Sequence, residues 1–219
     1  MQQKYLDLTR TIMHLPTAPF NEQHIANEVQ KIIQGSKRIS LEKDRYGNML
    51  LRYQGTKSQT SPQVIATAHM DHPALGYLEP LSPRRHLFEV LGGLPLAHLP
   101  GANFLVFRAQ GPEDQTPSSG RVSRVHKPPR GRALAEITTP TKLPPLTTED
   151  FALVDVPAWR VIGRRLYSRA CDDLAGLCCG LLMMLELDRQ KIKTNAGLLL
   201  TRAEEVGFGG MLAAVRSGF

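Results

Sequence analysis

The chain has 219 residues, of which 42% are apolar and 21% are charged, as is usual for a water-soluble globular protein. This composition excludes disorder of the whole chain. The sequence has no run of about eighteen apolar residues, so we expect no membrane-spanning helix. The net charge of +7 comes from basic residues scattered among prolines and glycines without alternating aromatics, so we expect neither a nucleic-acid nor a membrane partner.

The N-terminal part of the chain predicts two helices and a hairpin. Its first residues lack the basic and apolar segments of a signal peptide, which favours a cytoplasmic location. Apolar side chains at helical spacing predict a helix over residues 2–14, then a second that starts from an N-cap at Asn21 and stops near Gly35. Two alternating runs around the turn Tyr46-Gly47-Asn48 predict a β-hairpin.

Two apolar runs, PQVIATAHMD and AGLLLTRAEE, predict strands that are buried on both faces. Between them in the chain, residues 174–187 are apolar almost all round and predict a buried helix. Cys178 and Cys179 are expected to be small buried side chains of this helix rather than part of a disulfide framework. GFGGMLAAV predicts one more helix. Strands separated by helices indicate an α/β fold, with a mixed, mostly parallel sheet flanked by helices.

A proline-rich block, residues 77–165, interrupts this alternation. It contains short β-type runs, HLFEVL, NFLVFRA, RALAEIT and FALVDV, and shows no helical period. The block therefore predicts an inserted small β-barrel-like domain with proline-rich loops. We expect residues 1–76 and 166–219 to be the first and second parts of one α/β domain that carries the catalytic residues discussed next.

The first candidate functional cluster is His69-Met70-Asp71, at the end of the earlier core strand. Open α/β sheets place their ligand sites outside the carboxyl ends of the strands. A histidine and an aspartate two residues apart on an extended chain point to the same side, so Asp71 could orient His69 as a metal ligand. The alternative is a core histidine satisfied by hydrogen bonds, which is the better explanation when the cluster is taken alone.

Two acidic pairs occupy comparable positions. Asp172 and Asp173 precede the buried helix, where they either cap it and interact with its dipole or supply a carboxylate that bridges two cations. Glu204 and Glu205 follow the later core strand, where they either lie in a solvated turn or act as a metal ligand and a general base. Together the three clusters supply nitrogen and oxygen ligands that suit zinc, cobalt or manganese.

The segments TAHMDHPALGY, RACDDLAG and TRAEEVGFGG resemble the signature segments of the co-catalytic di-metal aminopeptidase clan. Within this clan the chain resembles the glutamyl/tetrahedral aminopeptidase (endoglucanase-M-like) family, whose zinc-exopeptidase-like domain carries a small β-domain in the slot of the proline-rich block. LPTAPFNEQ and DRYGNMLLRY resemble further segments of that family. The resemblance implies two divalent metal ions, zinc or cobalt first and manganese as an alternative, and hydrolysis of the first peptide bond of a peptide substrate.

Carried over by position, the resemblance implies that His69 binds one metal, that Glu205 binds the other, and that Asp172 bridges both. It also implies that Asp71 orients His69 and that Glu204 is the general base. The inserted domain would mediate dimerisation or larger homo-oligomers, or act as a lid.

The chain departs from the family pattern at three places. His72 and Leu174 replace residues that bear on substrate preference, and the family's remaining aspartate and histidine ligands would lie beyond Phe219. We therefore expect a C-terminally truncated chain with little or no activity. Two alternatives stay open: a related di-metal carboxypeptidase or deacylase, and a non-catalytic oligomerising remnant.

Overall fold

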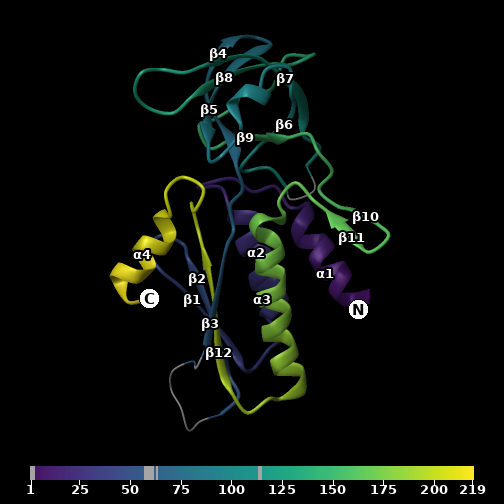
Figure 1. The fold of residues 1–219 in the computed structure, drawn as a ribbon, viewed down its shortest axis with the longest axis vertical. Helices are drawn as coiled ribbons and strands as arrows, with labels where there is room; N and C mark the ends of the chain where they lie inside the picture. Colours follow the sequence, from purple (N-terminus) through teal and green to yellow (C-terminus); the bar gives the residue numbers. More distant parts are fainter. Residues whose placement is uncertain (1–2, 57–61, 63, 113–114) are drawn as a thin grey trace. The chain divides into compact units, whose positions relative to one another are not determined.

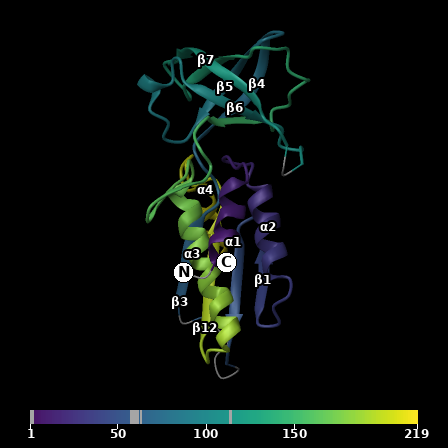
Figure 2. The same cartoon turned by 90° about the vertical axis from the view of Figure 1, so that its right-hand side faces the viewer.

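The computed structural model describes residues 3–56, 62, 64–112 and 115–219. The chain forms two compact units, one made of Met1–Asp71 with Ala158–Phe219 and the other of His72–Pro157. The first unit contains a sheet covered by helices, and the second contains a closed β-barrel (Figures 1 and 2). No helix among the described residues is both long and apolar enough to cross a membrane.

The sheet of the first unit has four strands in the order β1-β2-β12-β3. Their bounds are β1 Ile39–Lys43, β2 Met49–Gln54, β12 Asn195–Thr201 and β3 Val64–His69. The sheet is mixed as expected, but the prediction that it is mostly parallel is wrong. The predicted hairpin makes β1 and β2 antiparallel, β2 also pairs antiparallel with β12, and only β12 and β3 are parallel. A tight hairpin can only join antiparallel strands, so it determines the relative direction of β1 and β2, two of the four strands.

Helices cover both faces of the sheet, with α4 on one side and α1, α2 and α3 on the other (Figure 1). Their bounds are α1 Gln3–His14, α2 Gln23–Ile33, α3 Cys171–Gln190 and α4 Gly209–Ser217. All seven residues of β12 are buried, as its apolar sequence predicts. Leu198 and Leu200 belong to the core under α1–α3, whereas Leu199 packs with Ala214 of α4. The middle of the strand, residues 196–200, has no polar side chain because each face has its own helical layer.

Strand β3 is less buried than its sequence suggests. Val64 and Ile65 are 64% and 51% exposed, and burial begins only at Ala68 and His69. The expectation of burial on both faces is therefore wrong for the first half of the strand. Among the described residues, β3 is an edge strand with β12 as its single partner, so its N-terminal end has fewer neighbours.

Two helix details also differ from the predictions. The N-cap of α2 is Glu22 rather than Asn21, and its side chain makes no capping hydrogen bond. On α3, Cys178 is buried but Cys179 is exposed, because this helix has one face against the sheet and another in solvent. Gly180 lets α3 approach the sheet closely, since a Cβ there would lie 2.5 Å from Leu198 Cδ1.

The second unit is a closed antiparallel barrel in the order β4-β5-β8-β7-β6-β9. Its strands are β4 Ala74–Ser82, β5 Arg85–Leu91, β6 Asn103–Phe107, β7 Ser118–His126, β8 Leu134–Thr138 and β9 Phe151–Val154, with one short helix, η1 Leu96–His98. The four β-type runs of the proline-rich block correspond to β5, β6, β8 and β9, as predicted. A separate hairpin in the first unit, β10 Arg160–Ile162 and β11 Arg165–Tyr167, lacked a sequence prediction.

The barrel interior is filled by side chains that alternate along its strands. Phe88, Phe104 and Ile137 are fully buried there, and Gly120 admits Ile137, whose Cγ2 would lie 2.4 Å from a Cβ at that position. His86 is also buried, and neither of its ring nitrogens has a hydrogen-bond partner among the described residues. Burial lowers the pKa of His86, because the charged imidazolium loses its hydration.

Candidate metal centre

The three predicted clusters converge at one end of the sheet in the first unit. Strands β3 and β12 are parallel neighbours with Thr201 opposite His69, so the residues that follow them emerge side by side. Ligand atoms of His69, Glu204 and Glu205 lie within 4.8 Å of one another. Asp172, at the start of α3, brings its Oδ1 to 3.3 Å from Nε2 of His69. Three candidate ligands therefore gather at one point, and the exposed Asp172 side chain borders it through His69.

Both ring nitrogens of His69 face oxygen atoms. Nδ1 lies 3.1 Å from the carbonyl oxygen of Asp71 and 3.5 Å from its Oδ1, while Nε2 lies 3.8 Å from Glu204 Oε2 in addition to its contact with Asp172. Burial disfavours the imidazolium, but the hydrogen bond and charge of Asp71 and the charges of Glu204 and Asp173 outweigh burial and raise the pKa to about 9. The Nδ1 edge of His69 thus faces Asp71, and its Nε2 edge faces the carboxylates of Asp172 and Glu204.

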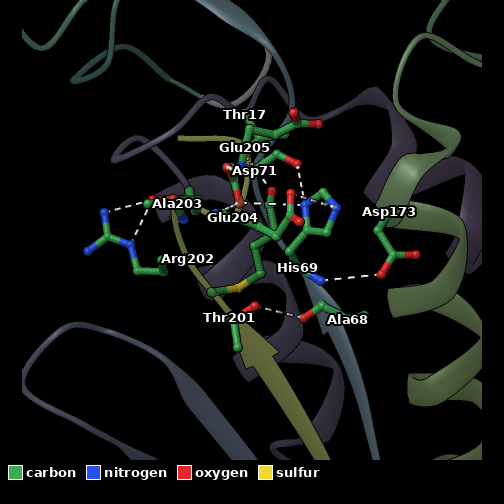
Figure 3. A network of polar contacts seen from close by, with 12 residues as sticks. Thr17, Ala68, His69, Asp71, Asp173, Thr201, Arg202, Ala203, Glu204 and Glu205 are labelled. Atoms are coloured by element: carbon green, nitrogen blue, oxygen red, sulfur yellow. Dashed lines mark hydrogen bonds and ion pairs between the residues drawn. The ribbon is translucent and has the colours of Figure 1, made fainter. Parts of the chain in front are cut away.

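The fully buried carboxylate of Asp71 holds the backbone of both glutamates (Figure 3). Its Oδ1 accepts the N–H of Glu204 at 3.0 Å, and its Oδ2 accepts the N–H of Glu205 at 3.1 Å. Charge-assisted bonds of this kind are roughly twice as strong as neutral ones. Asp71 was expected to orient His69, and the structure adds that it ties the end of β3 to the loop after β12.

The Asp172-Asp173 pair lies at the start of α3, where the backbone of both residues is non-helical and regular helical geometry begins after Asp173. No side-chain capping hydrogen bond of either residue is found among the described residues. Asp173 instead accepts the backbone N–H of His69 at 3.3 Å, while the Asp172 side chain is 90% exposed. A Cβ at Gly176 would lie 2.1 Å from Asp173 Oδ1, so glycine leaves the space that this carboxylate occupies. Asp173 therefore lies against both the first turn of α3 and the end of β3, whereas Asp172 is exposed beside His69.

Two residues that sequence reasoning missed support the glutamate loop. Glu22 is almost fully buried and accepts two bonds from Arg202, at 2.7 Å from Nε and 2.6 Å from Nη2. It also accepts the N–H of Ala203 at 3.0 Å. Burial raises the pKa of Glu22, and the Arg202 guanidinium opposes that rise. The sequence signal for this ion pair was Arg202, a charged residue that directly follows the buried strand β12.

The donor set of this cluster fits a divalent metal ion. One imidazole nitrogen and the carboxylates of Asp172, Glu204 and Glu205 are ligands that zinc, cobalt and manganese accept. His69, which is 9% exposed, turns its Nε2 toward these carboxylates. The partly exposed carboxylates also leave the cluster open to solvent and to a ligand.

The sheet, its helical layers and the separate barrel define a mixed α/β fold that is consistent with the zinc-exopeptidase-like architecture. Solved structures with a similar fold include a TET aminopeptidase and a putative peptidase/endoglucanase. A TET aminopeptidase from a marine-sediment Thaumarchaeota archaeon superposes with a TM-score of 0.77 at 17% identity, over 98% of this chain and 63% of that chain.

Two further structures give the same result. An aminopeptidase from Desulfurococcus kamchatkensis has a TM-score of 0.73 and 21% identity, over 98% of this chain and 60% of its own. The TET1 peptidase of Pyrococcus horikoshii, described as assembling into a tetrahedron or a large octahedral shell, has a TM-score of 0.72 and 18% identity, over 95% of this chain and 64% of its own. No family model and no curated protein sequence matches the chain. The chain shares their fold and spans less than two thirds of their length.

Proposed function

We propose that the first unit carries the catalytic cluster of a metal-dependent aminopeptidase, which hydrolyses the N-terminal peptide bond of peptides. The supporting observation is the convergence of His69 with Asp172, Glu204 and Glu205 at the carboxyl ends of the parallel pair β3 and β12. Several solved structures with the same fold are named aminopeptidases. Because the chain spans only part of their length, the activity is inferred from these side chains.

The proposed ligands are His69 for one metal, Glu205 for the other and Asp172 for both. When bound, the two divalent cations would polarise the scissile carbonyl and acidify a water molecule. Asp71 keeps the Nδ1 edge of His69 engaged, so that Nε2 remains available as a ligand. The same carboxylate fixes the backbone of the glutamate pair and therefore the origin of both side chains.

Glu204 is the proposed general base. Its carboxylate lies 3.8 Å from His69 Nε2 and is 27% exposed, so it borders the cluster and remains open to a water molecule. In the proposed reaction, Glu204 takes a proton from the water whose oxygen attacks the scissile carbonyl carbon. It then returns the proton to the leaving amine as the carbon–nitrogen bond breaks.

Metal titration of the 219-residue chain tests the cluster directly. We expect zinc and cobalt to bind, and cobalt to give visible absorption bands that disappear in His69→Ala. His98→Ala is a matched control, because His98 is an exposed histidine of the barrel. Failure of both metals to bind the wild-type chain, or equal binding by His69→Ala, would exclude the proposed centre.

A substrate panel separates aminopeptidase activity from the other di-metal hydrolases. In a version of the chain extended to the length of the similar aminopeptidases, peptides with a free N-terminus are expected to be cleaved one residue at a time, and the same peptides with an acetylated N-terminus are expected to resist. Cleavage restricted to blocked N-termini, or to the C-terminal residue, would favour a deacylase or carboxypeptidase instead.

We also propose that the chain self-associates through its barrel unit. The support is the description of two similar structures as a dodecamer and as a tetrahedral or octahedral assembly. Light scattering of the purified chain should therefore give a mass above that of a monomer. A monomeric mass at micromolar concentration, with metal present, contradicts this expectation.

A further inference from the structure

The backbone just before the glutamate pair has an unfavourable conformation. Ala203 has a φ of 52°, in the left-handed region that a Cβ disfavours. Ala203 is buried and directly precedes Glu204, so its conformation sets the direction in which the chain leaves β12. Such a residue persists only when its surroundings hold it in place.

Ala203 is held at both of its backbone polar groups: its carbonyl oxygen accepts the N–H of Gly209 at 3.1 Å, and its N–H donates to a side-chain carboxylate. Oε1 of Glu22 accepts the N–H of Ala203 at 3.0 Å. The same atom accepts the N–H of Phe20, also at 3.0 Å, and Phe20 is left-handed as well, with a φ of 70°. Glu22 therefore joins two left-handed turns that lie about 180 positions apart in the sequence.

Arg202 donates to the other oxygen of Glu22 and connects the two residues to the surrounding loops. It donates to Oε2 of Glu22 and also reaches the carbonyl oxygens of Phe20 at 2.7 Å and Tyr46 at 2.9 Å. A guanidinium supplies this fork of donors, whereas an ammonium is a compact charge. Every polar atom of the Glu22 carboxylate thus faces a donor, and this compensates for its burial.

We propose that Glu22 is a positioning residue, which fixes the left-handed turn at Ala203 and so aims the carboxylates of Glu204 and Glu205. Glu22 holds the residue just before the pair, and Asp71 accepts the backbone N–H groups of the pair itself. Glutamine at position 22 cannot substitute, because its amide group would turn a donor toward the donors of Ala203 or Arg202. That the positioned carboxylates serve a metal centre rests on the proposed function.

The test compares Glu22→Gln with Glu28→Gln, a control on the same helix whose carboxylate pairs with Lys31. Amide hydrogen exchange, read residue by residue by NMR in metal-free protein, reports the loop without any need for activity. In Glu22→Gln we expect the amides of Glu204 and Glu205 to exchange at least tenfold faster, while amides in the interior of β12 keep their rates. The control should match the wild type.

Cobalt titration of the same variants gives the second readout. Residues that support metal ligands typically change affinity ten- to a hundredfold, and we expect a loss in this range for Glu22→Gln. Faster loop exchange in a protein whose wild type binds no cobalt would support the positioning role and overturn the proposed function. Unchanged loop exchange would overturn the positioning role, whatever the metal affinity. A uniform rise of exchange along β12 would also overturn it, because it indicates only a general loss of stability.

If Glu22→Gln does not fold, Arg202→Lys decides the question. Lysine keeps the charge beside Glu22 but loses the fork that reaches Phe20 and Tyr46. The proposal requires a smaller, local rise in exchange at Glu204 and Glu205. Exchange identical to that of the wild type would overturn it.

Discussion

Gly210, in the first turn of α4, offers a direct test of how the loop after β12 is held. Its N–H donates to the carbonyl oxygen of Arg202 at 2.9 Å, and its own carbonyl accepts from Asn48 Nδ2 at 2.9 Å. A Cβ added here would lie 2.4 Å from both Arg202 O and Asn48 Oδ1. Ordinary contacts begin near 3.4 Å, so Gly210→Ala forces α4 and the end of β12 apart by about 1 Å.

This separation weakens three hydrogen bonds, because Arg202 N–H also donates to Asn48 Oδ1 at 3.1 Å. Each such bond contributes about 1 kcal/mol net. Alanine recovers up to about 1 kcal/mol of helix propensity over glycine. We therefore expect Gly210→Ala to lower the free energy of unfolding of the first unit by about 2 kcal/mol.

Urea denaturation followed by tryptophan fluorescence measures this change in the correct unit. Trp159, the single tryptophan of the chain, packs against the core of the first unit. The matched control is Gly209→Ala, whose Cβ would meet Ala203 only at 3.7 Å and beyond and should be neutral or stabilising. Equal stability of Gly210→Ala and the wild type would refute the close-contact reasoning, as would equal destabilisation by both variants.

Three further predictions concern the metal cluster and the barrel. In a version of the chain extended to the length of the similar aminopeptidases, Glu204→Gln should abolish peptide hydrolysis and leave metal content nearly unchanged by elemental analysis. Loss of metal would show that Glu204 is a ligand rather than the base. Asp172→Ala should remove both metals together, and retention of one at full occupancy would contradict a bridging role. Burial lowers the pKa of His86 in the folded chain below the ordinary 6.5 of the unfolded chain. At a pH between the folded and the unfolded pKa, the unfolded chain therefore binds more protons than the folded one. The barrel should therefore lose stability as pH falls from 7 to 5, which amide exchange at its core measures. His86→Phe should remove this pH dependence and stabilise the barrel by about 1 kcal/mol. His98→Phe, at an exposed position, should do neither.

Elements with a local cause are well predicted from the sequence. The helices over residues 3–14 and 23–33, the β1–β2 hairpin and four barrel strands all follow from patterns that are complete within a few residues. The order of the strands in the sheet is not predicted from the sequence, because it depends on which distant segments pair with one another. An apolar run such as that of β3 looks the same in the sequence whether it has one neighbouring strand or two.

The same distinction applies to the site. His69, Asp172 and the glutamate pair can be selected from the sequence because each carries recognisable chemistry at the end of a core element. Glu22 cannot be selected in this way, since its partners Arg202 and Ala203 lie far along the chain and one of its hydrogen bonds is to a backbone N–H. An acidic residue before a helix is read as a cap, and only the coordinates show it bound elsewhere.

The pairing of β3 with β12 has a consequence for the order in which the chain folds. It joins Val64 to Ala196, with the whole barrel between them in the sequence, whereas the β1–β2 hairpin closes a short loop. Long loops close late because their entropy cost precedes any gain from contacts. We expect the hairpin and the barrel to form early and the carboxylates, which repel one another, to be gathered last. Acquisition of a cation would then mark the end of folding, and a chain arrested before that step would expose the buried face of β12.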